Sequence, residues 1–267
     1  MNMKRIISIV TLITILIACE DEQIVEVSNS HEEFTVVQAE LKQNNRFPGV
    51  RFTKTLPLGT PYNIGAAELK NIIAYIRIND IQIIPLHYTF NGLYKPLYDF
   101  YIESGQVYEL FAERGETYIY GKTIIPEKPT ITQSNYNQGE YYLEARVRSF
   151  ESEVYSALWI IRSSSIEKAP DYFSVSVPGD ITNNSTVSVR SMTLPEEYRR
   201  PEYNGSRLIQ VFAFDKSFKP YFDSRTSGNS VNDPFIQGGG SIEWNVLGDN
   251  VIGMFIGVAE SNQIYVE

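Results

Sequence analysis

The amino-acid sequence predicts an all-β fold, and three observations support this prediction. Tyrosine (18 residues) and phenylalanine (14) are abundant, whereas methionine (4) and tryptophan (2) are scarce. Aromatic and β-branched residues favour strands. Short stretches in which apolar and polar residues alternate are separated by turn-forming residues. No segment of the N-terminal half sustains the 3.6-residue apolar period of an amphipathic helix.

The N-terminal half is predicted to consist of paired strands. Ile72–Ile78 places every second side chain on one apolar face, and Asn79-Asp80 is a turn signal before a returning strand at 81–90. A second hairpin is predicted to turn at Glu113–Glu116, between strands at 106–111 and 117–125. A further strand is predicted at 50–53.

A break in this pattern predicts the boundary between two domains. Pro126–Pro129 ends the last strand of the first half, and Ser134–Gly139 is polar and rich in turn-forming residues. We therefore expect an N-terminal domain over residues 33–130 and a C-terminal β-rich domain over 136–267. Strands of the second half are predicted near 143–148, 154–161, 172–177, 187–192, 208–214, 242–246, 252–258 and 264–266. A short helix is predicted near Lys216–Ser224, although Pro220 counts against it.

The first residues indicate export and lipid attachment. Lys4 and Arg5 precede an apolar run, Ile6–Ile17, that is too short to cross a bilayer core of about 30 Å as a helix but suits a signal peptide. The run ends in Leu16-Ile17-Ala18-Cys19, which resembles the lipobox of bacterial lipoproteins. We therefore expect residues 1–18 to be a signal peptide and Cys19, the only cysteine, to carry lipid and anchor the protein to a membrane. A plain secretory signal with an incidental cysteine is the alternative.

The charge of the mature chain restricts its partners. Removing Lys4 and Arg5 with the signal lowers the formal net charge from −9 to about −11, which argues against binding to nucleic acid or to an anionic membrane surface. Residues 19–32 are expected to form a polar tether that begins with the acidic run Glu20-Asp21-Glu22. One interpretation of this run is a solvated linker. The other is its resemblance to the surface-export signal of Bacteroidota lipoproteins, which implies display on the cell exterior.

Several segments together resemble a family of Bacteroidota outer-membrane lipoproteins known as a domain of unknown function, numbered forty-two forty-nine. After the lipobox, these segments are Ala74–Ile78, Gly105–Leu110, Gly115–Tyr118, Ile124–Pro126, Asn245-Val246 and Gly253–Gly257. Their order and spacing extend over most of the chain, although Gly248–Asn250 stands where the family is richer in glycine. The resemblance implies an immunoglobulin-like N-terminal sandwich followed by a second β-rich domain. It also suggests association with TonB-dependent outer-membrane receptors, with no established enzymatic activity, and it supplies no catalytic residues.

No pattern of residues predicts catalysis or metal binding. The two histidines are His31, in the expected tether, and His87, in a predicted strand, and no Gly-x-Ser-x-Gly turn presents a serine. Zinc has too few ligands, and Asp249-Asn250 is too small a set for calcium. Gly238–Gly240 lacks the Lys-Ser/Thr that follows in a phosphate loop. Two acidic residues could form a glycosidase pair, but nothing selects them. We therefore predict no cofactor, no metal and no enzyme.

Two aromatic clusters are candidate binding surfaces. The first comprises Tyr94, Leu97, Tyr98, Phe100 and Tyr101. The second is the loop that contains Tyr198, Arg199 and Tyr203. Core packing of the first cluster and a structural staple in the second are the alternatives, and we favour these over binding. Of the two, the loop is the better binding candidate, because tyrosine and arginine often carry binding energy at interfaces.

These observations favour a non-catalytic lipoprotein of the outer membrane that faces the cell exterior. The expected role is that of an accessory subunit or binding module of a TonB-dependent receptor-type complex, with an outer-membrane protein as partner. A carbohydrate-binding or adhesin-like module that acts alone, with a glycan as ligand, is the alternative. An enzyme with an unrecognised site is less favoured, and no interaction with nucleic acid is expected.

Overall fold

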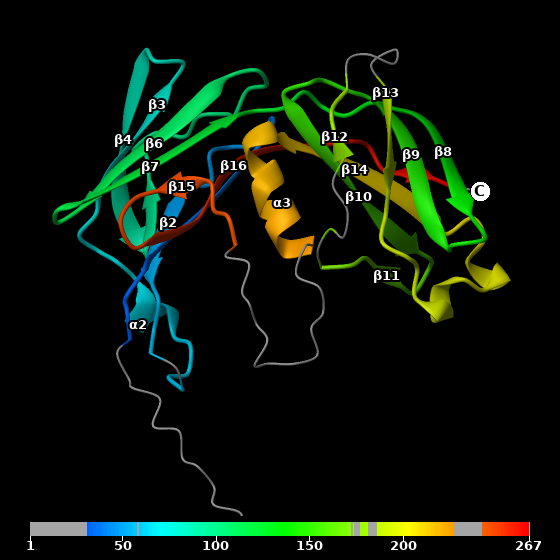
Figure 1. Cartoon of the computed structure of the whole chain (residues 1–267), viewed down its shortest axis with the longest axis horizontal. Coiled ribbons are helices and arrows are strands. Elements are labelled where there is room, and N and C mark those ends of the chain that lie inside the picture. The colour runs from blue at the N-terminus through cyan, green and yellow to red at the C-terminus, as the bar shows by residue number, and fades with distance from the viewer. Residues whose placement is uncertain are drawn as a thin grey trace, which may run out of the picture. The chain divides into compact units, whose positions relative to one another are not determined.

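The computed structural model describes residues 31–57, 59–171, 173, 177–180, 186–226 and 242–266 (Figure 1). Glu33–Glu267 forms one compact unit. The predicted signal peptide, Cys19 and the acidic run Glu20-Asp21-Glu22 lie outside the described residues. Strands dominate the described chain, so the predicted all-β class is confirmed.

The strands up to the connection between the two halves include both predicted hairpins. They are β1 (Thr35–Lys42), β2 (Val50–Lys54), β3 (Ile73–Ile78), β4 (Gln82–Phe90), β5 (Leu93–Lys95), β6 (Val107–Arg114) and β7 (Thr117–Ile124). Asn79, Asp80 and Ile81 connect β3 to β4. Asn79 (φ 49°) and Asp80 (φ 60°) lie in the left-handed region, and the Ile81 N–H donates to the Ile78 carbonyl oxygen at 3.0 Å, which closes a tight turn. A one-turn helix, α2 (Ile64–Ala67), follows β2.

The remaining strands belong to the second half of the chain. They are β8 (Ile131–Asn137), β9 (Tyr142–Arg148), β10 (Glu153–Arg162), β11 (Glu167–Lys168), β12 (Val177–Pro178), β13 (Thr186–Arg190), β14 (Arg207–Asp215), β15 (Val246–Leu247), β16 (Val251–Glu260) and β17 (Ile264–Tyr265). Short 3₁₀ helices occur at η1 (Glu196–Tyr198), η2 (Pro201–Tyr203) and η3 (Lys216–Phe218), and η3 leads into α3 (Lys219–Thr226). The helix predicted near Lys216–Ser224 is therefore confirmed. Pro220 is its second residue, where a missing N–H breaks no helical hydrogen bond.

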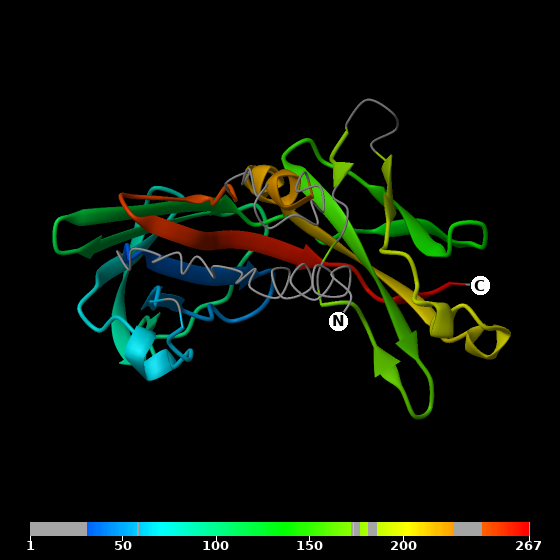
Figure 2. The same cartoon turned by 60° about the horizontal axis from the view of Figure 1, so that its bottom comes forward.

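One large sheet runs through both halves of the unit. Its strand order is β11-β10-β14-β16-β1-β2-β5-β4-β3-β6-β7-β15, and a separate three-stranded sheet has the order β13-β9-β8. The strand β16 pairs in parallel with all of β1, from Thr35 opposite Val251 to Lys42 opposite Val258 (Figure 2). Its last residues also pair with β14. A strand near the C-terminus therefore completes the sheet that the first strand begins.

The unit has two main hydrophobic cores. The first core contains Phe52, Tyr94, Tyr108 and Phe255, together with the inward side chains of β1, β3, β6 and β7. The second core lies between the β13-β9-β8 sheet and strands β10 and β14, and includes Tyr155 and Trp159. A smaller aromatic cluster around Phe214, Phe218 and Phe222 packs beneath α3.

Close contact between β16 and β7 depends on two glycines. A Cβ on Gly121 would lie 2.9 Å from the Cβ of Phe255, and one on Gly257 would lie 2.7 Å from the carbonyl oxygen of Ile124. Asn245 fixes Phe255 further, because its Nδ2 donates to the Phe255 carbonyl at 2.6 Å and its Oδ1 accepts from the Phe255 N–H at 2.9 Å. The segment Gly253–Gly257 therefore has a structural role in the first core.

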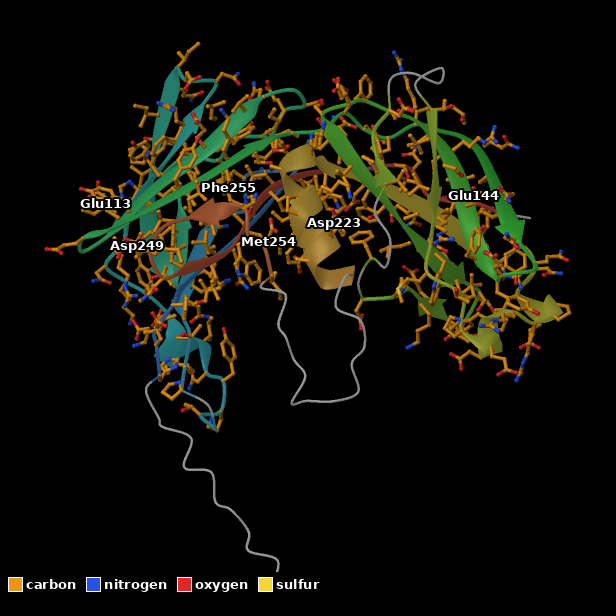
Figure 3. The ribbon with its side chains drawn as sticks, viewed as in Figure 1. Glu113, Glu144, Asp223, Asp249, Met254 and Phe255 are labelled. Atoms are coloured by element: carbon orange, nitrogen blue, oxygen red, sulfur yellow. The ribbon has the colours of Figure 1, made fainter. Side chains whose placement is uncertain are left out.

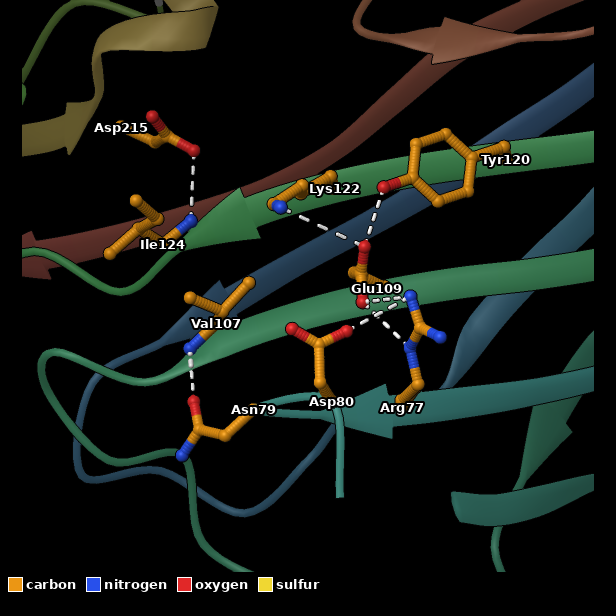
Figure 4. A network of polar contacts seen from close by, with 9 residues as sticks. All are labelled: Arg77, Asn79, Asp80, Val107, Glu109, Tyr120, Lys122, Ile124 and Asp215. Atoms are coloured by element: carbon orange, nitrogen blue, oxygen red, sulfur yellow. Dashed lines mark hydrogen bonds and ion pairs between the residues drawn. The ribbon is translucent and has the colours of Figure 1, made fainter. Parts of the chain in front are cut away.

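Two buried carboxylates hold the connection between the halves. Asp215 Oδ2 accepts a hydrogen bond from the Ile124 N–H at 2.8 Å (Figure 4), and Glu153 Oε1 accepts one from the Glu127 N–H at 2.8 Å. Glu153 and Asp215 are paired residues of β10 and β14, so both bonds come from one end of this strand pair. The connection is therefore anchored on the second half rather than exposed along its length.

Part of the segment predicted as the domain boundary forms a strand. Residues 134–137 of the polar segment Ser134–Gly139 belong to β8, an outer strand of its sheet. Val246, Val251 and Phe255, which we assigned to the second domain, pack in the first core. The division into domains at 33–130 and 136–267 and the immunoglobulin-like arrangement of the first stay predictions.

Candidate functional site

The loop predicted to bind a partner is packed onto the second core. Tyr198, at the end of η1, is 8% exposed, and its ring centroid lies 5.7 Å from that of Trp159 and 5.4 Å from that of Tyr203. Arg199 is half-buried: its Nε donates to the Leu194 carbonyl at 2.8 Å, and its guanidinium lies 4.3 Å from the centroid of the Tyr141 ring. The structure brings the three predicted residues together, with Tyr198 in the core.

Arg207 holds the backbone of the same loop through hydrogen bonds. This arginine is 3% exposed, and its Nη2 donates to the carbonyl oxygens of Tyr198, Arg199 and Arg200 at 3.0–3.2 Å. These contacts fit the staple interpretation that we favoured for the loop. The binding role of Tyr198, Arg199 and Tyr203 stays a prediction, with Arg199 and Tyr203 as its half-exposed members.

The first aromatic cluster divides into a buried and an exposed part. Tyr94 is fully buried in the first core and Phe100 packs against it, whereas Leu97, Tyr98 and Tyr101 are exposed. A groove of about 400 Å³ lies between this segment and the outer side of β4. Its walls include Ile83, Pro85, His87, Leu97, Tyr98 and Phe100. The segment therefore serves both the core and the surface.

A larger exposed surface lies on the side of β4, β3, β6, β7 and β15 that faces away from the first core. Opposed residues of paired strands share one side of a sheet. The register aligns Pro85 with Tyr75, Tyr75 with Phe111, Phe111 with Tyr120, and Tyr120 with Leu247. We call this surface the aromatic face. Its members are Ile73, Tyr75, Arg77, Ile83, Pro85, Glu109, Phe111, Glu113, Tyr118, Tyr120, Lys122 and Leu247.

Large apolar side chains on this face are open to solvent. Ile73 is 71% exposed, Ile83 62%, Tyr118 72% and Leu247 63%. Five strands spaced about 4.8 Å apart give the face a width of roughly 20 Å. Exposed apolar side chains that gather on one sheet surface mark an interaction site more often than single exposed residues do.

The aromatic rings of the face hold one another in place. Tyr75 and Phe111 stack with centroids 5.0 Å apart, and the ring of Tyr120 meets Phe111 edge-on at 5.2 Å. The Arg77 guanidinium lies 4.8 Å from the centroid of the Phe111 ring. These contacts reduce the freedom of the rings before any ligand binds, which lowers the entropic cost of binding.

A charged network beside the rings is centred on Glu109 (Figure 4). Its carboxylate accepts from Arg77 Nε at 2.8 Å and from the Tyr120 hydroxyl at 2.6 Å, and Lys122 Nζ lies 3.8 Å away. Burial by itself raises the pKa of Glu109, but the hydrogen bonds from Tyr120 and Arg77 outweigh it, and the net pKa is lowered. Burial together with the Glu109 carboxylate raises the pKa of Tyr120 to about 12. Glu109 is therefore ionised and Tyr120 neutral near pH 7.

Between the rings lies a second groove, with a volume of about 460 Å³. Its lining residues include Ile73, Tyr75, Phe111, Glu113, Tyr118 and Tyr120. A volume of this size falls within the range of small-ligand pockets. Aromatic walls and one carboxylate can accommodate a side chain or a small polar ligand, and nothing in this set forms a nucleophile with a general base.

Sequence reasoning missed the aromatic face, although a signal for it exists. The prediction for Ile72–Ile78 rests on the side chains of its inner side only, yet Ile73 and Tyr75 make the outer side apolar as well. The same holds for Phe111 in β6 and for Tyr118 and Tyr120 in β7. A hairpin whose outward positions are also aromatic is the pattern that distinguishes such a face from an ordinary solvated one.

Within residues 31–266, apart from the gaps given above, no group of three or more His, Cys, Asp and Glu side chains is placed to hold a metal ion. In the same described part, no helix combines the length and the apolar character needed to cross a bilayer. Comparison with known proteins finds no matching family model and no matching curated protein.

Proposed function

We propose that this chain is a non-catalytic, lipid-anchored protein of the outer membrane that binds a protein partner through the aromatic face. Its role is that of an accessory subunit of an outer-membrane complex of the TonB-dependent receptor type. The observation that carries the proposal is the exposure of Ile73, Ile83, Tyr118 and Leu247 on one sheet surface. Burial against a partner removes this apolar area from water at about 25 cal/mol per Å².

The composition of the face suits a protein partner. The centres of protein interfaces are rich in aromatic residues and arginine and poor in unpaired charge. Tyr75, Phe111 and Tyr120 occupy the middle of the face, and Arg77 is paired with Glu109 at 2.7 Å. Because Tyr75 and Phe111 stack on each other, one side of each ring is occupied, which disfavours the flat stacking that sugars prefer.

The proposed location depends on the N-terminal sequence. The lipobox-like segment Leu16-Ile17-Ala18-Cys19 supports lipid attachment, and Glu20-Asp21-Glu22 supports display on the exterior. An anchored protein and a partner in the same membrane are confined to one surface, which raises their effective concentration. Even a modest interface then gives lasting association.

A stand-alone glycan-binding module is the second candidate. The groove beside β4 favours it, because Tyr98 is 85% exposed and lies in that groove with Leu97 and His87. An exposed tyrosine ring offers a flat surface for stacking on a sugar, and His87 offers a hydrogen-bonding group.

The deciding experiment is purification of the tagged, full-length protein from membranes in mild detergent. The test variant carries Ile73→Ser, Tyr118→Ser and Leu247→Ser, three exposed positions of the face. The control variant carries Tyr62→Ser and Tyr265→Ser, which are also exposed but lie outside the face. We expect the wild type and the control to recover an outer-membrane protein in fixed proportion, and the test variant to recover at least about tenfold less.

Two results would count against the proposal. Equal recovery of the partner by the test variant would exclude the aromatic face as the docking surface. Absence of any partner, together with binding of purified glycans that is lost on Tyr98→Ala, would favour the stand-alone module.

A further inference from the structure

We propose that the groove between Ile73, Tyr75, Tyr118 and Tyr120 receives a lysine or arginine side chain of the protein partner, with Glu113 as its counter-ion. This inference depends on the proposed function, because it names the chemistry of the partner at one point of the aromatic face. The flanking partner residues are expected to be apolar, since Ile73 and Leu247 lie exposed on the same face.

The register places Glu113 in the wall of the groove. Glu113 is opposite Ile73 on β3 and opposite Tyr118 on β7, so its carboxylate stands between an exposed aliphatic and an exposed aromatic side chain. Next to this row along the strands is the row of Tyr75, Phe111 and Tyr120. A side chain that enters between the rows meets apolar walls first and the carboxylate beside them.

The charges around the groove favour a cation. Arg77 is held by Glu109 at 2.7 Å and by Asp80 at 3.1 Å, and Arg114 points to Glu33 at 2.6 Å. Glu113, by contrast, has no ion-pair partner within the part of the chain that the structure describes, and it is exposed. Figure 3 shows its side chain at the end of the β6–β7 hairpin. Arg77 and Arg114 are thus already paired, and Lys122 Nζ lies 3.8 Å from Glu109, which leaves the Glu113 carboxylate available to a cation of the partner.

Lysine and arginine match both features of the groove. Their apolar stems lie along hydrophobic walls while the charged head group reaches a polar partner. Tyrosine rings attract cations electrostatically, and a carboxylate forms strong, charge-assisted hydrogen bonds with them. The net charge of −9 adds long-range attraction for a basic partner and repels an anionic lipid surface.

The test uses two short synthetic peptides and the lipid-free, folded protein (Cys19→Ser). One peptide has a central lysine flanked by leucines, and the other has glutamate in place of the lysine. Binding is measured by titration at low ionic strength for the unsubstituted groove, for Glu113→Gln and for Glu144→Gln. Glu144 is the control, because it is an acidic residue in β9, outside the aromatic face (Figure 3); it is half-buried and accepts a hydrogen bond from the Ser188 hydroxyl.

We expect the lysine peptide to bind and the glutamate peptide to bind at least tenfold more weakly. Glu113→Gln should weaken the lysine peptide by about tenfold, because it removes the counter-ion while keeping the size of the side chain. Glu144→Gln should leave its affinity unchanged. Thermal melting midpoints of the variants should agree, since Glu113 is exposed and carries no structural ion pair in the described chain.

Equal affinity of the protein for the two peptides would overturn the inference. So would equal affinity of the lysine peptide for the Glu113→Gln variant and for the protein with Glu113. The purification experiment separates this failure from that of the proposed function. If the triple face variant loses its partner while Glu113→Gln has no effect in either assay, the proposed function stands and the basic side chain is excluded. If the lysine peptide binds through Glu113 but no partner is recovered, the groove is confirmed and the accessory role is not.

Discussion

The guanidinium of Arg207 lies 4.3 Å from the centroid of the Tyr136 ring, which joins the start of β14 to the outer strand β8 of the other sheet. Arg207 Nη1 also donates to Asn204 Oδ1 at 2.9 Å, and its Nη2 donates to the carbonyl oxygens of Tyr198 and Arg199. The two terminal nitrogens of this buried cation are bonded to oxygen atoms, whereas its buried Nε has no hydrogen-bond partner among the described residues. One side chain therefore links two sheets and a loop.

Replacing this cation should destabilise the second core. Arg207→Met keeps an unbranched apolar stem but removes the guanidinium, which leaves the carbonyls of Tyr198, Arg199 and Arg200 without their donor. We expect the free energy of unfolding to fall by about 2–4 kcal/mol, measured by urea denaturation. Arg146→Met, at an exposed position of β9, is the control and should change it by less than about 0.5 kcal/mol. A similar effect of both substitutions would contradict the linking role.

Truncating the predicted loop should reveal whether it is a staple or a binding surface. The double variant Arg199→Ala with Tyr203→Ala removes the bond to Leu194, the contact with Tyr141 and the ring against Tyr198. We expect a loss of about 1–3 kcal/mol in the free energy of unfolding and normal recovery of the partner. Unchanged stability combined with loss of the partner would restore the loop as the binding surface.

The Glu109 network should make stability depend on pH. A carboxyl whose pKa is lowered on folding contributes stability that is present above its unfolded pKa, about 4.3, and is lost as pH falls through the folded value. We expect Glu109→Gln to cost about 1–3 kcal/mol at pH 7 and the difference from the wild type to shrink below about pH 4. Urea denaturation of both proteins at several pH values measures this difference in the free energy of unfolding. A difference that stays constant down to pH 3 would mean that Glu109 is not the titrating group.

Lipid attachment should depend on a single thiol. Cys19→Ser removes the only cysteine, so incorporation of labelled fatty acid should be abolished. Alanine at Glu20, Asp21 and Glu22 should leave the label in place but protect the protein from external protease on intact cells. Undiminished label in Cys19→Ser would contradict the lipoprotein prediction, and protease resistance of the wild type would contradict surface display.

Local features of the fold could be predicted from the sequence, whereas distant pairings could not. The β3–β4 hairpin follows from the alternation of Ile72–Ile78 and the turn at Asn79-Asp80, all within one short segment. The parallel pairing of β1 with β16 leaves no local signal, because it joins Thr35 to Val251. Residues 134–137 of β8 belong to the polar, turn-rich segment Ser134–Gly139 that the sequence predicts as a boundary, because an outer strand needs few apolar residues.

The candidate site was predictable in part. The Tyr94–Tyr101 cluster was recognised as aromatic, but its division into buried Tyr94 and exposed Tyr98 depends on the neighbouring strands. Tyr198 was expected in an exposed loop because its sequence neighbours are polar, and the structure places its ring against Trp159. Single-sequence patterns show which residues share a side of a strand, and only the assembled sheet shows which side is covered.

The pairing of β1 with β16 also sets an order of events for a chain that is synthesised from its N-terminus. Until Val251–Glu260 has emerged, β1 has an open edge and the first core lacks Phe255. Folding therefore waits on contacts of very long sequence separation, which slows it, and the waiting edge is exposed to pairing with other chains. A prematurely terminated product that lacks β16 is left with an unfinished sheet, and its open strand edge is a feature that quality-control proteases can recognise.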